Sequence, residues 1–283
     1  MSDDSARPSR RVDALVRHLP PGVAGPLRHV WGGIRRTFTR LHPAPVFMLG
    51  MQKSGTTAIA ALAAQRSGLE ATLDLLPEIK QPMLPKVYRG EISLQRFIRT
   101  NSIGFSRPLV KEASLSPLRD RLGERFPDAR FVWILRRPED TIRSILNRLS
   151  LPGHQAELTP EQWSAVPAVW KTVLDSSWLG LPGGDYVERL AHRWQFTAER
   201  YASHAGTDVL VTYEAFLSDK PACIDHLLNT LALPARHDIS ARLDHRFQPG
   251  GDRHVDLDAF FGPDRLRRIH AICRSGIASI YQP

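Results

Sequence analysis

Three continuous apolar runs mark the chain, and each is followed by a stretch with the spacing of a helix. The runs are VFML (residues 46–49), FVWIL (131–135) and DVLVTY (208–213). An apolar run of this length without polar alternation is typical of a strand that is buried on both faces, as in a parallel sheet. Strand followed by helix, repeated three times, predicts an α/β fold with a central parallel sheet and helices on both faces.

The helical stretches have recognisable ends. The helix after the first strand, at residues 56–68, stops at Gly68, a residue that favours helix C-termini. In the helix after the second strand, Pro138 suits the first turn and apolar residues recur on one face. The same periodicity predicts helices at 118–126, 185–203, 223–233 and 263–280. Ligands of such sheets bind beyond the carboxyl ends of the strands, so the loops that follow the strands are the candidate site.

Two long segments lack a clear pattern. Residues 70–110 hold several prolines and only short apolar pieces, so we expect an irregular wall there rather than part of the central sheet. Residues 150–185 hold Trp163, Trp170 and Trp178, and we interpret this segment as an insertion that overhangs an acceptor site. Stacking on a sugar or an aromatic ring would suit these tryptophans, although such residues more often belong to a core.

Residues 1–44 differ in composition from the rest, because they are rich in arginine and proline. Pro20, Pro21 and several glycines interrupt any long helix, so we expect a partly helical basic arm outside the core. Peripheral membrane contact through this arm stays open beside a loosely packed surface segment, since basic amphipathic segments can rest on membranes.

Composition narrows the class of protein. The chain has 283 residues, of which 42% are hydrophobic, and we assign residues 45–283 to one domain. The absence of a long apolar run and of a secretory signal pattern favours a cytoplasmic enzyme. Cys223 and Cys273 are not spaced for a metal site. The net charge of +9 favours anionic partners. Nucleic acid is disfavoured because the arginines are spread along the chain rather than clustered with aromatic residues.

The stretch GMQKSGTT (50–57), directly after the first strand, looks like a phosphate-binding loop with its lysine displaced. Gly50 and Gly55 are spaced as in a P-loop, where backbone N–H groups point at a phosphate, although a glycine turn can also simply begin an ordinary helix. The P-loop lysine follows the second glycine, whereas Lys53 precedes Gly55, so it would reach a group beyond the phosphate. Further hydrogen bonds can come from the hydroxyls of Ser54, Thr56 and Thr57.

A second anion site is indicated after the second strand. Arg136 follows the strand directly, and Ser144 lies eight residues later in the next helix. Arginine offers a planar fork to a phosphate, and a serine hydroxyl can close its other side. Taken alone, the pair is more typical of a charged loop and a helix-surface serine, but two phosphate sites in one sheet support each other. No Walker-B pattern is present, which argues against a magnesium-dependent kinase.

Together these motifs resemble those of the sulfotransferases that use 3′-phosphoadenosine 5′-phosphosulfate. QKSGTT (52–57) is similar to the family's 5′-phosphosulfate loop, and LRRPEDTIRS (135–144) to its 3′-phosphate motif. VKEAS (110–114) stands where many members have Lys-Thr/Ser-Pro, and residues 209–233 resemble the late strand and helix. The resemblance covers about residues 45–275, is closer to the carbohydrate and bacterial type than to the His-base cytosolic type, and implies a three-layer, P-loop NTPase-like fold.

The resemblance implies that the chain binds this donor as a co-substrate without a metal. The loop would hold the 5′ phosphate, Lys53 would reach the bridging oxygen and the sulfuryl group, and Arg136 with Ser144 would hold the 3′ phosphate. Tyr213 would border the nucleotide, and Arg253, in a weaker match, would contact the 3′ phosphate. The residues assigned to the donor are Gln52, Lys53, Ser54, Gly55, Thr56, Thr57, Arg136, Ser144, Tyr213 and Arg253.

Transfer to a hydroxyl also needs a base that removes its proton. Family members use a His or a Glu, and no His lies in residues 108–116. Glu78 and Glu112 are therefore the candidates, and an exposed surface carboxylate is an equally good interpretation of each. Lys111 is the candidate for a second cation near the sulfuryl group, with a solvated lysine as its alternative.

The sequence thus predicts a sulfotransferase that acts on the hydroxyl of a small-molecule or glycan acceptor. Carbohydrate, lipid or lipid-linked sugar, peptide and aromatic metabolite all stay open as acceptors. Two other functions stay open as well: a P-loop kinase of a small alcohol or nucleoside, and a non-catalytic relative that only binds nucleotide.

Overall fold

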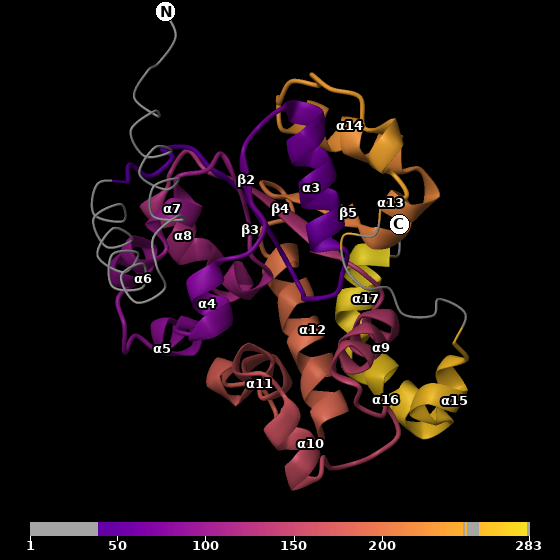
Figure 1. The fold of residues 1–283 in the computed structure, drawn as a ribbon. Coiled ribbons are helices and arrows are strands. Elements are labelled where there is room, and N and C mark those ends of the chain that lie inside the picture. Colours follow the sequence, from indigo (N-terminus) through magenta and orange to yellow (C-terminus); the bar gives the residue numbers. More distant parts are fainter. Residues whose placement is uncertain (1–38, 246, 248–254, 282–283) are drawn as a thin grey trace, which may run out of the picture.

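The structure, a computed structural model, describes residues 39–245, 247 and 255–281. Most of the basic arm and Arg253 lie outside this part of the chain. A five-stranded parallel sheet forms the centre, in the order β2-β3-β1-β4-β5 (Figure 1). Its strands are β1 (Val46–Gly50), β2 (Ala71–Thr72), β3 (Leu109–Lys111), β4 (Arg130–Leu135) and β5 (Val209–Thr212).

Helices occupy most of the remaining chain. The α-helices are α3 (Thr56–Ser67), α4 (Leu76–Lys80), α5 (Leu84–Tyr88), α6 (Leu94–Thr100), α7 (Ser102–Phe105), α8 (Arg119–Arg125), α9 (Pro138–Leu149), α10 (Pro160–Ala165), α11 (Ala168–Leu174), α12 (Tyr186–Ala202), α13 (Tyr213–Ser218), α14 (Lys220–Thr230), α15 (Leu257–Phe261), α16 (Pro263–Ile272) and α17 (Arg274–Tyr281). The 3₁₀ helices are η2 (Ala113–Leu118), η3 (Ser177–Leu179) and η4 (Ser240–Arg242). None of the described helices combines the length and the apolar character that crossing a bilayer requires.

Both faces of the sheet are covered, which confirms the predicted three-layer α/β fold. Successive side chains of a strand point to opposite faces. Val46 and Met48 of β1 accordingly belong to a core with α3 and α14. Phe47 and Leu49 belong to a core with α5, α6, α7 and α8 on the other face. β1 is buried along its whole length, as expected for a central parallel strand.

The prediction for residues 70–110 was wrong in part, because two strands of the sheet come from this region. β2 and β3 pair with each other, and β3 pairs with β1. They contain two and three residues, so neither is long enough to show an apolar run in the sequence. The rest of the region forms α4 to α7.

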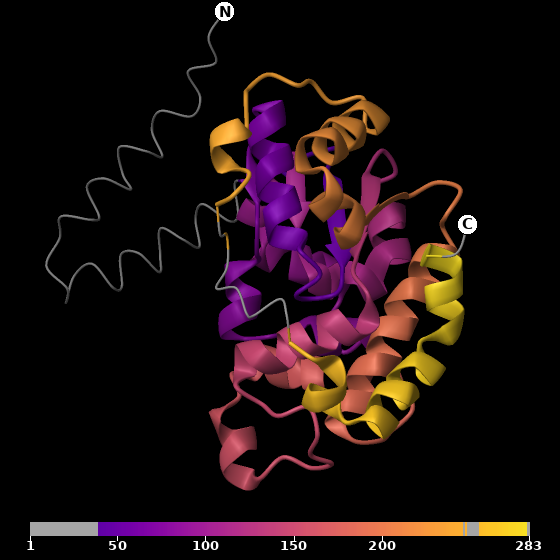
Figure 2. The same ribbon diagram turned by 90° about the vertical axis from the view of Figure 1, so that its right-hand side faces the viewer.

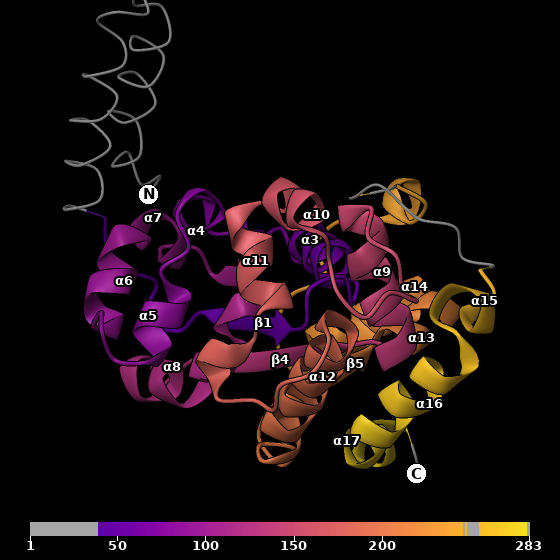
Figure 3. The same cartoon turned by 90° about the horizontal axis from the view of Figure 1, so that it is seen from below.

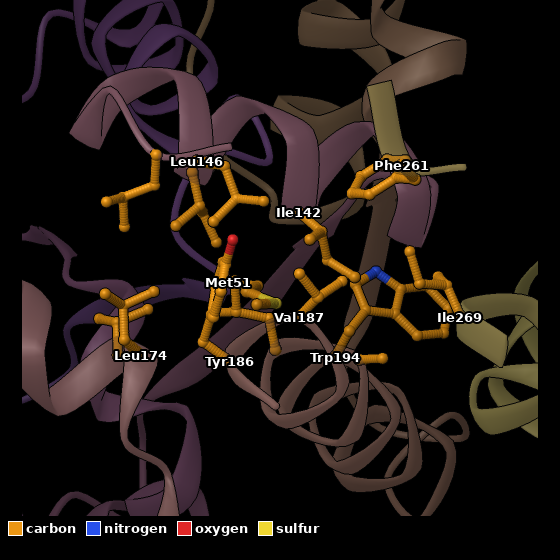
Figure 4. Packing of buried hydrophobic residues seen from close by; sticks show 14 of the residues in the cluster. Met51, Ile142, Leu146, Leu174, Tyr186, Val187, Trp194, Phe261 and Ile269 are labelled. Carbon is orange, nitrogen blue, oxygen red and sulfur yellow. The ribbon is translucent and has the colours of Figure 1, made fainter. Parts of the chain in front are cut away.

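A third core lies beside the carboxyl end of the sheet, around α9 and α12. Met51 follows β1 directly into this cluster, where it is buried together with Ile142, Trp194 and Ile269 (Figure 4). α17 lies along α12 (Figure 2). The predicted single C-terminal helix is divided into α16 and α17 at Cys273, whose side chain is fully buried.

The described part of the predicted arm, residues 39–44, contacts the core. Leu41 packs against the cluster that contains Phe47, and the backbone N–H of His42 donates to the carbonyl of Phe105 at 2.9 Å. The end of the arm is therefore anchored beside α7. The membrane contact predicted for residues 1–44 stays a prediction, and residues 1–38 of that arm lie outside the described residues.

Candidate active site

The loop of residues 50–57, here called the donor loop, turns sharply between β1 and α3. Gly50 (φ 136°), Lys53 (φ 68°) and Gly55 (φ 87°) all have positive φ, which is strained for residues with a side chain. At Gly50, a Cβ atom would lie 2.1 Å from the carbonyl oxygen of Ile134 on β4. The turn therefore requires glycine at this position, as the sequence motif predicted.

Gly55 brings the donor loop against Tyr213, the first residue of α13. A Cβ atom at Gly55 would lie 2.2 Å from a ring carbon of Tyr213. The guanidinium of Arg136 lies over the same ring, 4.8 Å from its centroid, which is a cation–π distance. Three residues that the sequence assigned to the donor thus meet, although they follow three different strands.

The N-terminus of α3 is open to an anion. Gly55 is the N-cap residue and supplies no side-chain acceptor for the first backbone N–H groups of the helix, which carry a partial positive charge. Thr56 and Thr57 form its first turn. Burial, and then the charges of Arg148 and Arg136, lower the pKa of the Lys53 ammonium. A bound anion would relieve this clustering of positive charge.

Arg136 belongs to a second cluster of positive charge at the start of α9. Its guanidinium lies 3.3 Å from the Asp140 carboxylate, and the guanidinium of Arg143 lies 3.2 Å from the same oxygen. Two arginines share one carboxylate, so the cluster keeps a net positive charge. Ser144 follows Asp140 by four residues on α9 and is half-buried, which places it on the same face of the helix. The arrangement suits a phosphate.

Hydrogen bonds connect the donor loop to the neighbouring loops. The hydroxyl oxygens of Ser54 and Thr141 lie 3.5 Å apart, and Thr141 donates to the carbonyl of Arg136 at 3.2 Å. On the other side, the Gln52 amide donates to the Ser114 hydroxyl at 2.8 Å. The loops after β1, β3 and β4 are therefore held together at the carboxyl edge of the sheet.

A cavity of about 290 Å³ adjoins the donor loop at Gln52. Its walls come from α4, α5, α11, η3 and the segment after β3, and α4 lies beside α11 (Figure 3). The lining residues are Gln52, Asp74, Glu78, Ile79, Pro82, Leu84, Glu112, Ser114, Arg148, Val169, Trp170, Thr172, Val173 and Trp178. Both candidate bases and two of the three tryptophans at 163, 170 and 178 thus line one space.

Glu78 is buried, with 3% of its surface exposed. One carboxylate oxygen, Oε2, accepts hydrogen bonds from the backbone N–H groups of Met83 (2.9 Å) and Leu84 (3.1 Å). The other, Oε1, has no partner among the described residues. Burial raises the pKa of Glu78 to about 7; the nearby charge of Glu112 also raises it, while the two backbone N–H groups lower it. Such a carboxylate is suited to accept a proton near neutral pH.

Glu112 and Lys111 are both engaged in local contacts. The two oxygens of Glu112 accept from the backbone N–H groups of Ser114 (3.0 Å) and Leu75 (3.2 Å), so this carboxylate caps η2 and fixes the segment before α4. The Lys111 ammonium lies 2.7 Å from the carboxylate of Asp74 and is buried. Lys111 does not line the cavity, and its contact with a sulfuryl group stays a prediction.

Arg148 is a site residue that the sequence motifs missed. It lines the cavity, is exposed, and lies close enough to Lys53 to lower the pKa of that ammonium. Arg148 follows Ser144 by four residues, so the face of α9 that carries the predicted phosphate site also carries this cation. That spacing was the signal in the sequence.

The segment 150–185 contributes one side of the cavity through α11 and η3. Trp170 and Trp178 line the cavity, whereas Trp163 is 37% exposed and lies outside the lining. Its overhang above an acceptor remains a prediction. Within residues 39–245, 247 and 255–281, no group of three or more His, Cys, Asp or Glu side chains is arranged to hold a metal ion.

Comparisons with known proteins find a similar fold but no similar sequence. No family model matches the chain, and no curated protein matches its sequence. A sulfotransferase from Mycobacterium avium superimposes with a TM-score of 0.54 at 14% identity, covering 89% of this chain and 80% of that one. A sulfotransferase from Mycobacterium tuberculosis H37Rv gives a TM-score of 0.51 at 15% identity, covering 86% and 79%. The chain therefore has the fold of the sulfotransferases, as its motifs predicted.

Proposed function

We propose that this protein transfers a sulfuryl group from 3′-phosphoadenosine 5′-phosphosulfate to the hydroxyl of an acceptor. The observation that carries the proposal is one cavity that joins the donor loop, at Gln52, to the buried carboxylate of Glu78. A phosphate cradle alone would fit many nucleotide-binding proteins. A cradle that opens onto a carboxylate with a pKa near 7 fits group transfer to a hydroxyl.

In this proposal, the donor lies across the carboxyl edge of the sheet. The backbone N–H groups at the start of α3 hold the 5′ phosphate. Arg136, oriented by Asp140 and by the ring of Tyr213, holds the 3′ phosphate together with Ser144. Arg148 lines the cavity and lies near Lys53 of the donor loop, and the sulfuryl group would be presented between these two cations. Arg253 lies outside the described residues, and its contact with the 3′ phosphate remains a proposal.

The transfer step needs a proton acceptor and a stabilised leaving group. The donor supplies the activated sulfuryl group. Glu78 Oε1 removes the hydroxyl proton as the acceptor oxygen bonds to sulfur, and the bond between sulfur and the bridging oxygen breaks. Lys53 stabilises the negative charge that develops on that oxygen, which becomes part of the 5′ phosphate of the released 3′,5′-bisphosphate. Sulfur exchanges one oxygen for another, and the proton ends on Glu78.

Glu78 is a better base than Glu112 because of how their oxygens are used. Both oxygens of Glu112 accept backbone hydrogen bonds, whereas Oε1 of Glu78 is free of partners among the described residues. A base must be within hydrogen-bond reach of the proton that it removes. Glu112 contributes through its charge, which helps to raise the pKa of Glu78.

The donor site is tested by calorimetric titration with adenosine 3′,5′-bisphosphate in EDTA. We expect metal-free binding that is weakened about 10- to 100-fold in Arg136→Ala, since hydrogen bonds to charged groups contribute roughly 1.5–3 kcal/mol. Adenosine 5′-monophosphate should bind wild type and Arg136→Ala equally, because it lacks the 3′ phosphate. Arg125→Ala is the matched control: it removes the same charge from α8, where Arg125 lies over the ring of Phe126.

Binding of ATP with magnesium in place of the bisphosphate would contradict the proposal and favour the P-loop kinase. Bisphosphate binding in wild type and Arg136→Ala alike would contradict the assignment of the 3′ phosphate to Arg136. If the protein binds the bisphosphate but does not form it from the sulfuryl donor with any acceptor of a wide screen, the non-catalytic relative is favoured.

A further inference from the structure

The walls of the cavity are mainly apolar where they do not touch the donor loop. Ile79, Pro82 and Leu84 come from the region of α4 and α5, and Val169 and Val173 come from α11. The two regions face a common space of about 290 Å³, the lower end of the range for small-molecule sites. Hydrocarbon surface in such a site favours hydrocarbon in its ligand.

Most polar side chains of the cavity already have partners within the protein. The oxygens of Glu112 accept backbone hydrogen bonds, Asp74 pairs with Lys111, and the Thr172 hydroxyl donates to the carbonyl of Val169 at 2.7 Å. These contacts hold the walls in place and use part of the hydrogen-bonding capacity of the three side chains within the protein.

Trp178, one of the two tryptophans that line the cavity, is engaged in the same way. The indole N–H of Trp178 donates to the carbonyl of Thr172 at 2.8 Å. Its ring contacts Tyr88 edge to face and lies 5.4 Å from the guanidinium of Arg193, which is itself buried. Trp178 therefore presents hydrocarbon to the cavity and no donor.

Among the residues that line the cavity, two have a buried acceptor atom with no partner in the described part of the chain: Glu78, with Oε1, and Gln52, with Oε1. We place the acceptor hydroxyl next to these two residues, because Ile79, Pro82, Leu84, Val169 and Val173 offer it no polar side-chain atoms. A sugar would leave several hydroxyls unpaired, at a loss of roughly tenfold in affinity for each.

We propose that the acceptor is a hydrocarbon alcohol with a single hydroxyl, whose apolar body fills the cavity between α4 and α11. This inference rests on the proposed sulfuryl transfer and names the acceptor class that the same site selects. The hydroxyl lies between Gln52 and Glu78, and the body contacts Ile79, Val169 and Val173.

The apolar surface continues out of the cavity along α4. Ile79 lines the cavity and is nevertheless 46% exposed, and Leu76, one turn earlier on the same helix face, is 69% exposed. Large exposed apolar side chains next to an apolar cavity indicate a bound apolar group. A chain longer than the cavity would therefore leave over Leu76 and Ile79.

The test is a homologous series of linear alcohols, from 1-butanol to 1-decanol, against glucose and N-acetylglucosamine, with release of adenosine 3′,5′-bisphosphate from the donor as the readout. We expect kcat/KM to rise roughly three- to fourfold for each added methylene until the cavity is full, and the sugars to be inactive. Turnover of the sugars with inactive alcohols would overturn the inference and leave sulfuryl transfer intact.

The donor titration and an alcohol titration separate the two proposals. Binding of 1-decanol is measured by calorimetry with Glu78→Gln in the presence of adenosine 3′,5′-bisphosphate. If adenosine 3′,5′-bisphosphate binds and 1-decanol does not, the acceptor class is wrong and the proposed function stands. If adenosine 3′,5′-bisphosphate does not bind, the proposed function is wrong, and the acceptor class falls with it.

Two variants test whether a long acceptor leaves the cavity over the exposed face of α4. Leu76→Ser should lower kcat/KM for 1-decanol about three- to fivefold and leave 1-butanol within twofold, since Leu76 lies outside the cavity lining and only the longer chain reaches it. Leu217→Ser is the control, because Leu217 is also an exposed leucine (37%), and it lies on α13, outside the cavity lining. Equal losses for both alcohols, or none for 1-decanol, would overturn the exit over α4.

Discussion

The donor side and the acceptor side of the candidate active site use different kinds of chemical groups. The donor side uses backbone conformation and positive charge: glycines with positive φ, the N-terminus of α3, and the guanidinium of Arg136 over Tyr213. The acceptor side uses side chains from short helices, which enclose an apolar space with a buried carboxylate. Gln52 is the residue that belongs to both, since it lies in the donor loop and lines the cavity.

On the acceptor side, the exclusion of water has two effects. Exclusion of water favours a hydrocarbon acceptor, and the same burial raises the pKa of Glu78 to about 7. The donor side needs the opposite, because the donor proposed for it carries several charges that cations and N–H groups would hold. Variants that affect one side and spare the other therefore test whether the two sides work as described.

The largest effect is expected at Glu78, compared with Glu112. Glu78→Gln keeps an oxygen for the N–H groups of Met83 and Leu84 but removes the base. We expect kcat with 1-decanol to fall by about 10²- to 10⁴-fold, with unchanged affinity for adenosine 3′,5′-bisphosphate. Product release and calorimetry measure the two quantities.

Glu112→Gln should behave in the opposite way. It loses one of two accepted backbone hydrogen bonds, so the free energy of unfolding should fall by about 1–3 kcal/mol. The rate of the folded protein should fall less than tenfold. If Glu112→Gln abolishes turnover and Glu78→Gln does not, the assignment of the base is wrong.

The next effect concerns Gly55, with Gly90 as its matched control. Both have positive φ (87° and 81°), but a Cβ atom at Gly55 would collide with the Tyr213 ring, whereas one at Gly90 would meet nothing within 4 Å. Gly90→Ala should lower the free energy of unfolding by about 1 kcal/mol. Gly55→Ala should lower it by about 2–4 kcal/mol, because overpacking adds to the backbone strain. Urea unfolding measures both.

Binding separates these two variants further. Gly55→Ala should weaken adenosine 3′,5′-bisphosphate binding, since it moves the donor loop or the ring of Tyr213, and Gly90→Ala should not. Combining Gly55→Ala with Tyr213→Ala should restore part of the lost stability. Equal losses in the two single variants would show that the contact with Tyr213 carries no strain.

The donor side could be predicted from the sequence because its signals are local. Gly50, Lys53 and Gly55 lie within six residues, and Arg136 directly follows a visible strand. Positive φ and close backbone approach permit few residue types, so they leave a motif. Arg148 was missed because its role depends on how α9 is placed beside the donor loop, although its spacing from Ser144 was visible.

The acceptor side could be predicted only in outline. Glu78 was a candidate, but its burial follows from α4 packing beside α11, helices about 90 residues apart in the sequence. β3 has three residues, so its place next to β1 depends on pairing that no local pattern shows. Apolar walls from separate short helices have no fixed spacing, and so the sequence left the acceptor open.

The smallest effect is a pH dependence of stability that Glu78 should impose. Its pKa is raised from 4.5 to about 7 in the folded protein. Below pH 4.5 the carboxyl is protonated in the folded and the unfolded chain, so the stability gained by burying Glu78 in its neutral form is fully present. Between pH 4.5 and about 7 the unfolded chain releases this proton while the folded protein retains it, so stability is lost as the pH rises.

Glu78→Gln cannot lose this proton and serves as the reference. From pH 5 to pH 8, the free energy of unfolding of wild type should fall relative to that of Glu78→Gln by on the order of 2 kcal/mol. Urea unfolding at several pH values measures the difference, in which other titrating groups cancel. Parallel profiles would mean that water reaches Glu78 freely. The acceptor side would then be solvated like the donor side, and a hydrocarbon acceptor would lose its physical basis together with the neutral-pH base.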